Sequence, residues 1–167
     1  MNKMKEIRIE KITLNIGTGE AGNKLQKATK LLKSLAGQTP VEAKAKRRIP
    51  TWGVRPGAII GTKVTVRKNM DEMISRMLAA VGNKLSINKI GGGTFSFGIS
   101  EYIEIPGARY DAEVGIIGLG VMVTLERPGF RIKKRSIMKR KIPKRHLISQ
   151  EETINFLQEK FKIKIID

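Results

Sequence analysis

The sequence predicts an α+β protein built on one mixed, mainly antiparallel sheet, with helices packed on one face and the other face open. Two kinds of spacing support this prediction. Alternating apolar and polar residues are typical of half-buried strands, and apolar residues three or four positions apart are typical of amphipathic helices. The 167 residues are 40% hydrophobic, enough to bury a core, and show no internal repeat and no clear linker. We therefore expect a single domain that spans residues 1–167.

The first strand is predicted over residues 7–16. Its apolar residues have odd numbers up to Ile9 and even numbers from Ile12 onward. Such a change of parity would turn the apolar side chains to the other face of the sheet unless the strand bends or holds an extra residue. We therefore expect a bulge or bend at Glu10 and Lys11.

A helix, a basic loop and two more strands follow. Apolar residues at helical spacing run from Leu25 to Leu35, and Gly37 should end this helix. Strands are predicted at 39–44 and 59–67. The loop between them, residues 44–61, is long and rich in glycine, proline and basic residues, which indicates a functional segment.

The remaining elements follow from the same two spacings. Asn69, with Glu72 three residues later, predicts the start of a helix that ends at Gly82, and Ser149 with Glu152 predicts the capping box of a last helix. Strand spacing predicts, in order, 95–105 with an interruption at Glu101, a strand from Val114 to Leu125, and a last edge strand within 161–166.

Positive charge is concentrated in two segments. The chain has 33 Lys and Arg against 15 Asp and Glu, a net charge of +18. Residues 43–70 and 127–150 contain no acidic residue. Clusters of one sign favour a polyanionic partner such as nucleic acid. The second segment has the composition of an exposed arm, residues 127–146, whose basic residues include Arg131, Lys133, Lys134, Arg135, Lys139, Arg140 and Lys141.

The strand pattern also places polar residues on one face of the sheet. Val64 and Val66 should face the core, so the alternate residues of the same strand point the other way. With the polar residues of the first strand they form a face made of Lys11, Thr13, Asn15, Lys63, Thr65 and Arg67. Such side chains can neutralise phosphates and hydrogen-bond riboses or base edges. We expect this face to bind RNA; the alternative is a merely solvated surface.

Trp52, the single tryptophan, lies in the basic loop between Arg48 and Arg55. This composition suits stacking on a nucleobase or ribose. The alternative is an aromatic side chain that packs over the edge of the core.

Few residues suggest catalysis. Gly17, Gly19 and Gly22 form a GxGxxG pattern, with Glu42 about twenty residues further on, as in a dinucleotide-binding site. A dinucleotide-dependent enzyme is therefore one alternative, but no doubly wound series of strands and helices follows, and a tight turn explains the glycines equally well. There is no cysteine, and the single His146 should face solvent or RNA. We expect no cofactor, no metal site, no small-molecule substrate and no catalytic activity.

Several motifs together resemble the large-subunit ribosomal protein five family, the proteins that bind 5S ribosomal RNA. They occur in the family's order over roughly residues 7–126: Lys11-Ile-Thr-Leu-Asn-Ile-Gly-Thr-Gly-Glu20, Gly37-Gln-Thr-Pro-Val41, Lys44-Ala-Lys46, Val54-Arg-Pro-Gly57, Ile60-Gly-Thr-Lys-Val-Thr-Val-Arg67 and Gly93-Thr-Phe-Ser-Phe-Gly98. The glycine pattern is part of this family signature. The basic arm after Arg127 is similar to that of archaeal and eukaryotic members, which suggests an archaeal source.

The resemblance implies a structural protein of the central protuberance. Its implied partners are 5S rRNA, 23S-type rRNA, the transfer RNA in the peptidyl site and neighbouring ribosomal proteins. By this resemblance, the polar positions that contact 5S rRNA in the family correspond to Asn15, Gln38 and Thr65. The family's transfer-RNA loop corresponds to residues 44–61, with Lys44, Lys46, Arg47, Arg48, Trp52 and Arg55 as contacts.

The chain should work in the cytoplasm, on the ribosome. It contains no apolar run of the length needed to cross a membrane and no apolar signal core at its N-terminus. We therefore expect a soluble intracellular protein with no membrane partner. Its charge alone would also fit a non-specific nucleic-acid chaperone, which is the second alternative.

Overall fold

The computed structural model describes residues 2–19 and 22–166. Its strands are β1 (Arg8–Gly17), β2 (Val41–Lys44), β3 (Ile59–Val66), β4 (Lys84–Ser86), β5 (Ile90–Gly91), β6 (Thr94–Ile99), β7 (Leu119–Glu126) and β8 (Lys164–Ile166). Its helices are α1 (Asn23–Ala36), α2 (Met70–Ala80), α3 (Arg131–Lys134) and α4 (Gln150–Phe161). None of the helices in the described ranges is long and apolar enough to cross a membrane.

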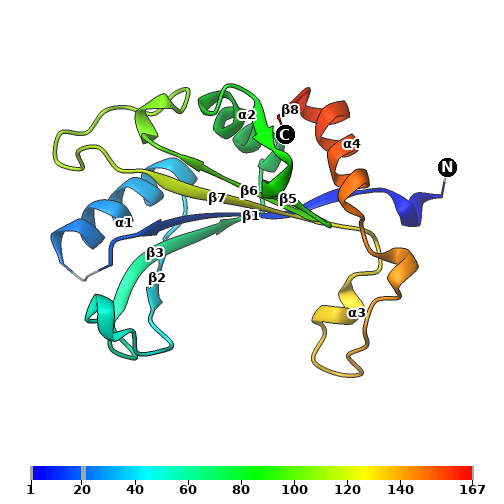
Figure 1. Cartoon of the computed structure of the whole chain (residues 1–167), viewed down its shortest axis with the longest axis horizontal. Coiled ribbons are helices and arrows are strands. Elements are labelled where there is room, and N and C mark those ends of the chain that lie inside the picture. Colours follow the sequence, from blue (N-terminus) through cyan, green and yellow to red (C-terminus); the bar gives the residue numbers. More distant parts are fainter. Residues whose placement is uncertain (1, 20–21, 167) are drawn as a thin grey trace.

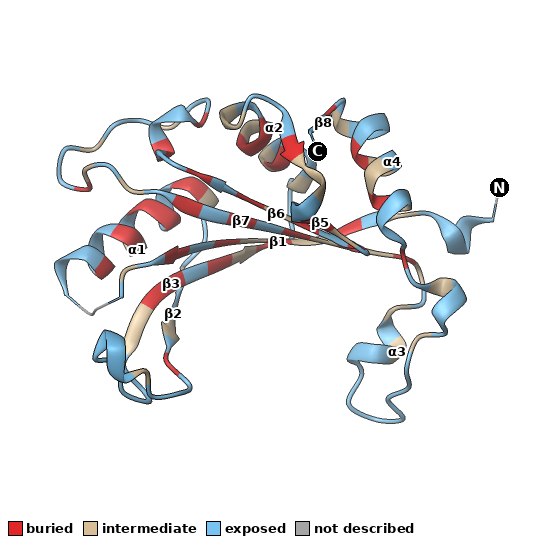
Figure 2. Ribbon diagram, viewed as in Figure 1, coloured by how far each residue is buried: buried red, intermediate tan, exposed pale blue. Residues whose placement is uncertain are grey.

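Six strands form one antiparallel sheet in the order β2-β3-β1-β7-β6-β5. The other two, β4 and β8, form a separate parallel pair. Buried side chains of α1, α2 and α4 pack with the inward residues of the sheet in one hydrophobic core (Figure 2). The α+β prediction is confirmed, since helices cover one face of a mainly antiparallel sheet.

Two projections extend from the sheet on the side away from α2 and α4 (Figure 1). One is the loop between β2 and β3, and the other is the segment after β7 that carries α3. They lie at opposite ends of the sheet. The two acid-free segments of the sequence therefore flank one side of the molecule.

The predicted bulge in β1 is confirmed. The register of β1 against β7 shifts between Ile9 and Lys11. Ile9 and Ile12 are both buried as a result, although they are an odd number of residues apart. The extra residue of the bulge lets the apolar side chains before and after it point to the same side of the sheet, toward the core, and this explains the change of parity.

The predicted end of α1 is also confirmed. Gly37 adopts a left-handed conformation with φ of 64°, and its N–H donates to the carbonyl of Lys33. Glycine tolerates this conformation without steric penalty, so it ends the helix where the apolar pattern ends. All the residues predicted for its apolar side are buried, namely Leu25, Ala28, Leu31, Leu32 and Leu35.

The predicted caps of the other helices differ in outcome. Asn69 precedes α2 but has φ of 50°, and its side chain makes no capping hydrogen bond. A capping side chain requires an extended backbone at that residue, so Asn69 occupies the predicted N-cap position but its side chain does not cap the helix. The capping box of α4 is confirmed: the N–H of Glu152 donates to Ser149 Oγ at 3.2 Å, and the N–H of Ser149 donates to Glu152 Oε2 at 3.0 Å.

The strand predicted over 95–105 ends earlier, at Ile99. A short 3-10 helix, Tyr102–Glu104, follows and turns Tyr102 into the core, where its hydroxyl accepts a hydrogen bond from the Asp111 N–H at 3.0 Å. Ile103, predicted to face inward, is 40% exposed. The pairing partner β7 begins only at Leu119, rather than at the predicted Val114, so residues beyond Ile99 have no strand beside them.

Candidate nucleic-acid interface

Polar residues of β1 and β3 lie side by side on the face of the sheet that the helices leave open. The register pairs Thr13 with Thr65 and Asn15 with Lys63. Asn15 and Lys63 are exposed and the two threonines are half-buried. Strand alternation therefore placed these four residues on the expected face.

The other residues expected at this face are placed less uniformly. Arg67 is exposed directly after β3, and Gln38 is exposed in the turn between α1 and β2. Lys11 lies on the open face opposite Thr124, but its Nζ is 3.5 Å from a carboxylate oxygen of Glu10. A surface pair of this kind is weak, so Lys11 can exchange it for a phosphate.

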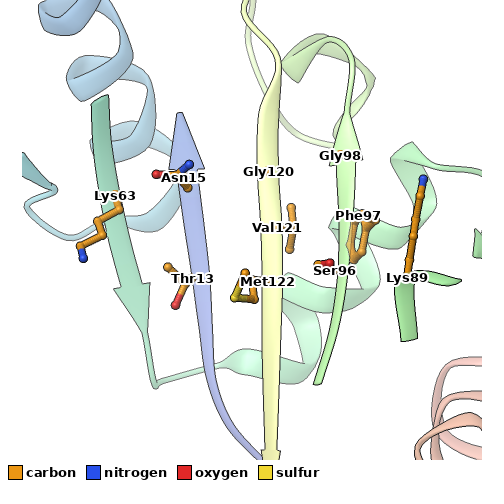
Figure 3. A pocket seen from close by; sticks show the side chains of 10 residues that line it. All are labelled: Thr13, Asn15, Lys63, Lys89, Ser96, Phe97, Gly98, Gly120, Val121 and Met122. Atoms are coloured by element: carbon orange, nitrogen blue, oxygen red, sulfur yellow. The ribbon is translucent and has the colours of Figure 1, made fainter. Parts of the chain in front are cut away.

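A shallow depression of about 510 Å³ lies in the middle of the open face (Figure 3). It is lined by Thr13, Asn15, Lys63, Lys89, Ser96, Phe97, Gly98, Gly120, Val121 and Met122. Two of these residues are lysines at opposite ends of the depression in Figure 3, and none is acidic. Lys89, Ser96 and Met122 were not predicted from the sequence, although the alternation of β6 and β7 could have placed the last two on this face.

The polar side chains of this face are available to a partner. Within the described residues, no intramolecular hydrogen bond is made by the side chains of Thr13, Asn15, Thr65 or Ser96, which the open face leaves to solvent. Donors and acceptors in a half-buried position lose free energy when a partner covers them without pairing them. The face therefore suits a partner that offers its own hydrogen-bonding groups, as nucleic acid does.

The basic loop between β2 and β3 is held together by its own backbone. The N–H of Ala45 donates to Ala58 O at 2.8 Å, and Ile49 and Val54 form a bridge. Ala45 and Val54 are buried. This frame leaves the expected contact residues exposed: Lys44, Lys46, Arg47, Arg48, Trp52 and Arg55.

Trp52 stands at the end of a short 3-10 helix in this loop and is 76% exposed. It does not pack over the edge of the core, so that alternative is wrong. An indole exposed to this degree among arginines offers a flat surface on which a base or ribose can stack.

The arm contains both free and paired cations. Its residues Arg131, Lys133, Arg135, Lys139, Arg140 and Lys141 are exposed. Lys134 instead binds two carboxylates of the sheet, Glu10 at 2.8 Å and Glu126 at 2.7 Å. Burial of Glu10 opposes its ionisation, but the hydrogen bond and charge of Lys134 outweigh this effect and lower the pKa of Glu10. Lys134 therefore ties the arm to the sheet, which the sequence did not predict.

The two ends of the arm are fastened by Arg127, which is buried rather than exposed. Its guanidinium donates to Glu152 Oε1 at 2.6 Å and to Leu147 O at 3.1 Å. Hydrogen bonds from the Ser149 backbone, together with this ion pair, lower the pKa of Glu152 despite partial burial. A charge this deeply buried requires a partner, so the contact fixes where the arm leaves and rejoins the core.

His146 belongs to the same structure, and the expectation that it faces solvent or RNA is wrong. It is half-buried, its Nε2 lies 2.9 Å from Pro128 O, and its ring meets Phe130 edge-on at 5.7 Å between centroids. Both contacts lie at the base of the arm. The imidazole therefore has a structural role there.

The glycine-rich turn lacks the geometry of a dinucleotide site. The N–H groups of Thr18 and Gly19 both donate to Ile60 O at 3.0 Å, so neither is free to bind a phosphate. The strand β3 lies between β1 and β2 and is antiparallel to both. The expected turn runs to Gly22, and residues 20 and 21 fall outside the described part of the chain. In the described residues no group of three His, Asp or Glu side chains could hold a metal ion.

Comparisons with known proteins agree along the whole chain. The family described as "Ribosomal protein L5" matches residues 2–55, and the model of the C-terminus of the same ribosomal protein family matches residues 59–156. The large ribosomal subunit protein uL5 of Sulfurisphaera tokodaii is 49% identical over 170 residues, covering 100% of this chain and 96% of that protein. The protein of the same name from Nanoarchaeum equitans is 50% identical over 165 residues, with 98% of each chain covered. That of Methanococcus vannielii is 41% identical, covering 98% of this chain and 93% of its own length.

Proposed function

The chain belongs to the ribosomal protein L5 family, structural constituents of the large ribosomal subunit, and on this basis we propose that it binds 5S rRNA and contacts the P-site tRNA. The open face of the sheet holds the 5S rRNA in the central protuberance. The loop of residues 44–61 reaches the tRNA. Both roles are performed without catalysis, on the ribosome in the cytoplasm, by a single RNA-binding domain.

The observation that carries this proposal is the open face itself. Asn15 and Thr65 present polar groups that have no hydrogen-bond partner among the described residues, beside the exposed cation of Lys63. The lysine supplies affinity by releasing counterions from RNA phosphates, and this contribution does not depend on sequence. The polar groups supply register, because their hydrogen bonds form only when riboses or base edges have the right positions. Gln38, which is exposed in the turn before β2, is the remaining polar contact in this proposal.

The loop suits a second RNA. It projects from the sheet next to β2 (Figure 1), and its own backbone hydrogen bonds support it. Its exposed Trp52 and neighbouring arginines can stack on a nucleotide and neutralise its phosphate. A projecting, self-supported loop can reach a partner that the sheet does not touch.

The arm extends from the other end of the sheet (Figure 1). Its exposed cations, Arg131, Lys133, Arg135, Lys139, Arg140 and Lys141, suit the phosphates of 23S-type rRNA. Neighbouring ribosomal proteins of the central protuberance are the remaining partners in this proposal.

A competition experiment tests the proposal against charge-driven binding. The protein is titrated with labelled 5S rRNA in the presence of bulk DNA while the salt concentration rises. A specific complex should weaken with salt but keep its preference for 5S rRNA, because its hydrogen bonds are insensitive to counterions. Loss of preference together with strength would support the non-specific chaperone instead. A parallel thermal-shift titration with dinucleotides should give no stabilisation; a saturable shift would favour the enzyme alternative.

A further inference from the structure

Two glycines lie side by side on neighbouring strands of the open face. Gly98 of β6 is paired with Gly120 of β7, and both are exposed. They lie in the depression of the open face, between Asn15 and Lys63 on one side and Lys89 on the other (Figure 3). At this point the sheet presents bare peptide groups with no side chain over them.

The fold does not require glycine at either position. A Cβ atom at Gly98 would meet nothing within 4 Å, and one at Gly120 would lie 3.7 Å from Asn15 O, an ordinary contact. Neither residue has a positive φ. By contrast, a Cβ at Gly61 would lie 2.6 Å from Ile16 O, so packing does demand glycine there. Because glycine inside a strand lowers stability, its use where packing permits a side chain marks a place that another molecule approaches closely.

The surroundings of the glycine pair define what can occupy the depression. Met122, on the same strand as Gly120, is 53% exposed and lies beside the bare peptide groups. Asn15 and Ser96 offer hydrogen-bonding groups at the rim, and Lys63 and Lys89 place a cation beyond each end. These features match the parts of one nucleotide and its neighbours. The flat floor and the polarisable thioether suit a base, the polar groups suit its edge, and the cations suit the flanking phosphates.

We propose that the depression receives one unpaired nucleobase of the bound RNA, which lies flat on the peptide groups of Gly98 and Gly120. This inference rests on the proposed function and specifies which feature of the RNA the open face recognises. Met122 stacks against the base and Asn15 reads its edge. Lys63 and Lys89 hold the phosphates on either side of the extruded nucleotide.

A continuous duplex would not use these features. A-form RNA presents phosphates and 2′-hydroxyls to a protein surface and keeps its bases stacked inside. It would span the two lysines but leave the depression empty. Single-stranded loops and bulges can place a base there, because their nucleotides are already unstacked.

The test fills the depression without disturbing the fold. In Gly98→Val the new side chain enters the space where the base would lie, and a β-branched residue suits a strand. Ser34→Val is the control: Ser34 is exposed on α1, on the side of the sheet that the helices cover, it does not line the depression, and serine and valine have similar helix propensities. We expect Gly98→Val to weaken 5S rRNA binding about tenfold or more, the scale of losing one stacked base. The melting temperature of Gly98→Val should be unchanged or higher, and Ser34→Val should change affinity less than about twofold.

A second arm of the experiment identifies the base. Each unpaired nucleotide of 5S rRNA is replaced in turn by an abasic one, and binding is measured with wild type and Gly98→Val. At one position the abasic change should weaken wild type and have no further effect on the variant, because both changes remove the same contact. Additive losses at every position would overturn the inference, as would equal binding by Gly98→Val and wild type.

The outcomes separate this inference from the function on which it rests. Wild-type protein that binds 5S rRNA no better than unrelated RNA would overturn the proposed function and the inference with it. Wild-type protein that prefers 5S rRNA while Gly98→Val keeps the full preference would overturn the inference alone.

Discussion

Replacing Thr65 by valine removes a single hydroxyl and thereby separates the contribution of β3 to RNA binding from its contribution to folding. Thr65 lies on the open face opposite Thr13 and is half-buried. Its side chain makes no hydrogen bond with the described part of the protein. Valine has nearly the same shape and an equal or higher preference for strands, so the free energy of unfolding should change little.

The expected loss therefore falls on RNA binding. In the complex, the hydroxyl would be covered and paired with a ribose, phosphate or base edge. Its removal leaves that RNA group buried without a partner, which costs about 1–3 kcal/mol, or about 5- to 150-fold in affinity. Because the hydroxyl carries no charge, the dependence of affinity on salt should keep its slope.

Fluorescence anisotropy with labelled 5S rRNA at several salt concentrations measures both quantities. Thr62→Val is the control within the same strand. Thr62 is fully buried on the helix side, and its hydroxyl makes only a long contact of 3.5 Å to Val41 O, so this change should have little effect on folding and leave the affinity for RNA unchanged. Wild-type affinity in folded Thr65→Val, or an equal loss in both variants, would refute the assignment of Thr65 to the interface.

Three further predictions concern the projections. Trp52→Ala should keep 5S rRNA affinity within about twofold but impair tRNA binding to assembled large subunits, because a stacking surface is lost only from the loop; equal losses would place the loop in the 5S interface. Lys133→Gln should reduce the slope of log affinity against log salt by about one unit, whereas Lys134→Gln should leave the slope unchanged and speed proteolysis of the arm, since Lys134 is already paired with carboxylates. The folded pKa of Glu152 lies below its ordinary value of 4.5, so its stabilisation is complete above that value and is lost as pH falls through the folded pKa. Thermal unfolding from about pH 6 to pH 3 should show this loss in wild type and a flatter curve in Glu152→Gln; parallel curves would contradict it.

The local features of the fold could be predicted from the sequence. The bulge at Glu10, the end of α1 at Gly37 and the capping box of α4 depend on a few consecutive residues, and each is confirmed. Ile103 was misplaced because its outcome depends on where the partner strand begins. The residues of one strand say little about where its partner strand begins, because that partner is distant in the sequence.

Parts of the candidate site needed coordinates for the same reason. From composition, Arg127, Lys134 and His146 were expected in one exposed arm, but each has a partner that is not its neighbour in the sequence. The depression was not predicted because four strands contribute to it, and because Gly98 and Gly120 have no side chain whose polarity could assign them to a face. The polar residues of β1 and β3 were found because alternation within one strand suffices to place them.

The loop after β2 and the arm after β7 leave the sheet from opposite ends on the same side (Figure 1). An RNA segment bound on the open face would therefore lie between these two projections and could contact one of them at each end. Such a complex dissociates only when the contacts of both projections break, so changes in its affinity should appear mainly in the dissociation rate rather than in the association rate.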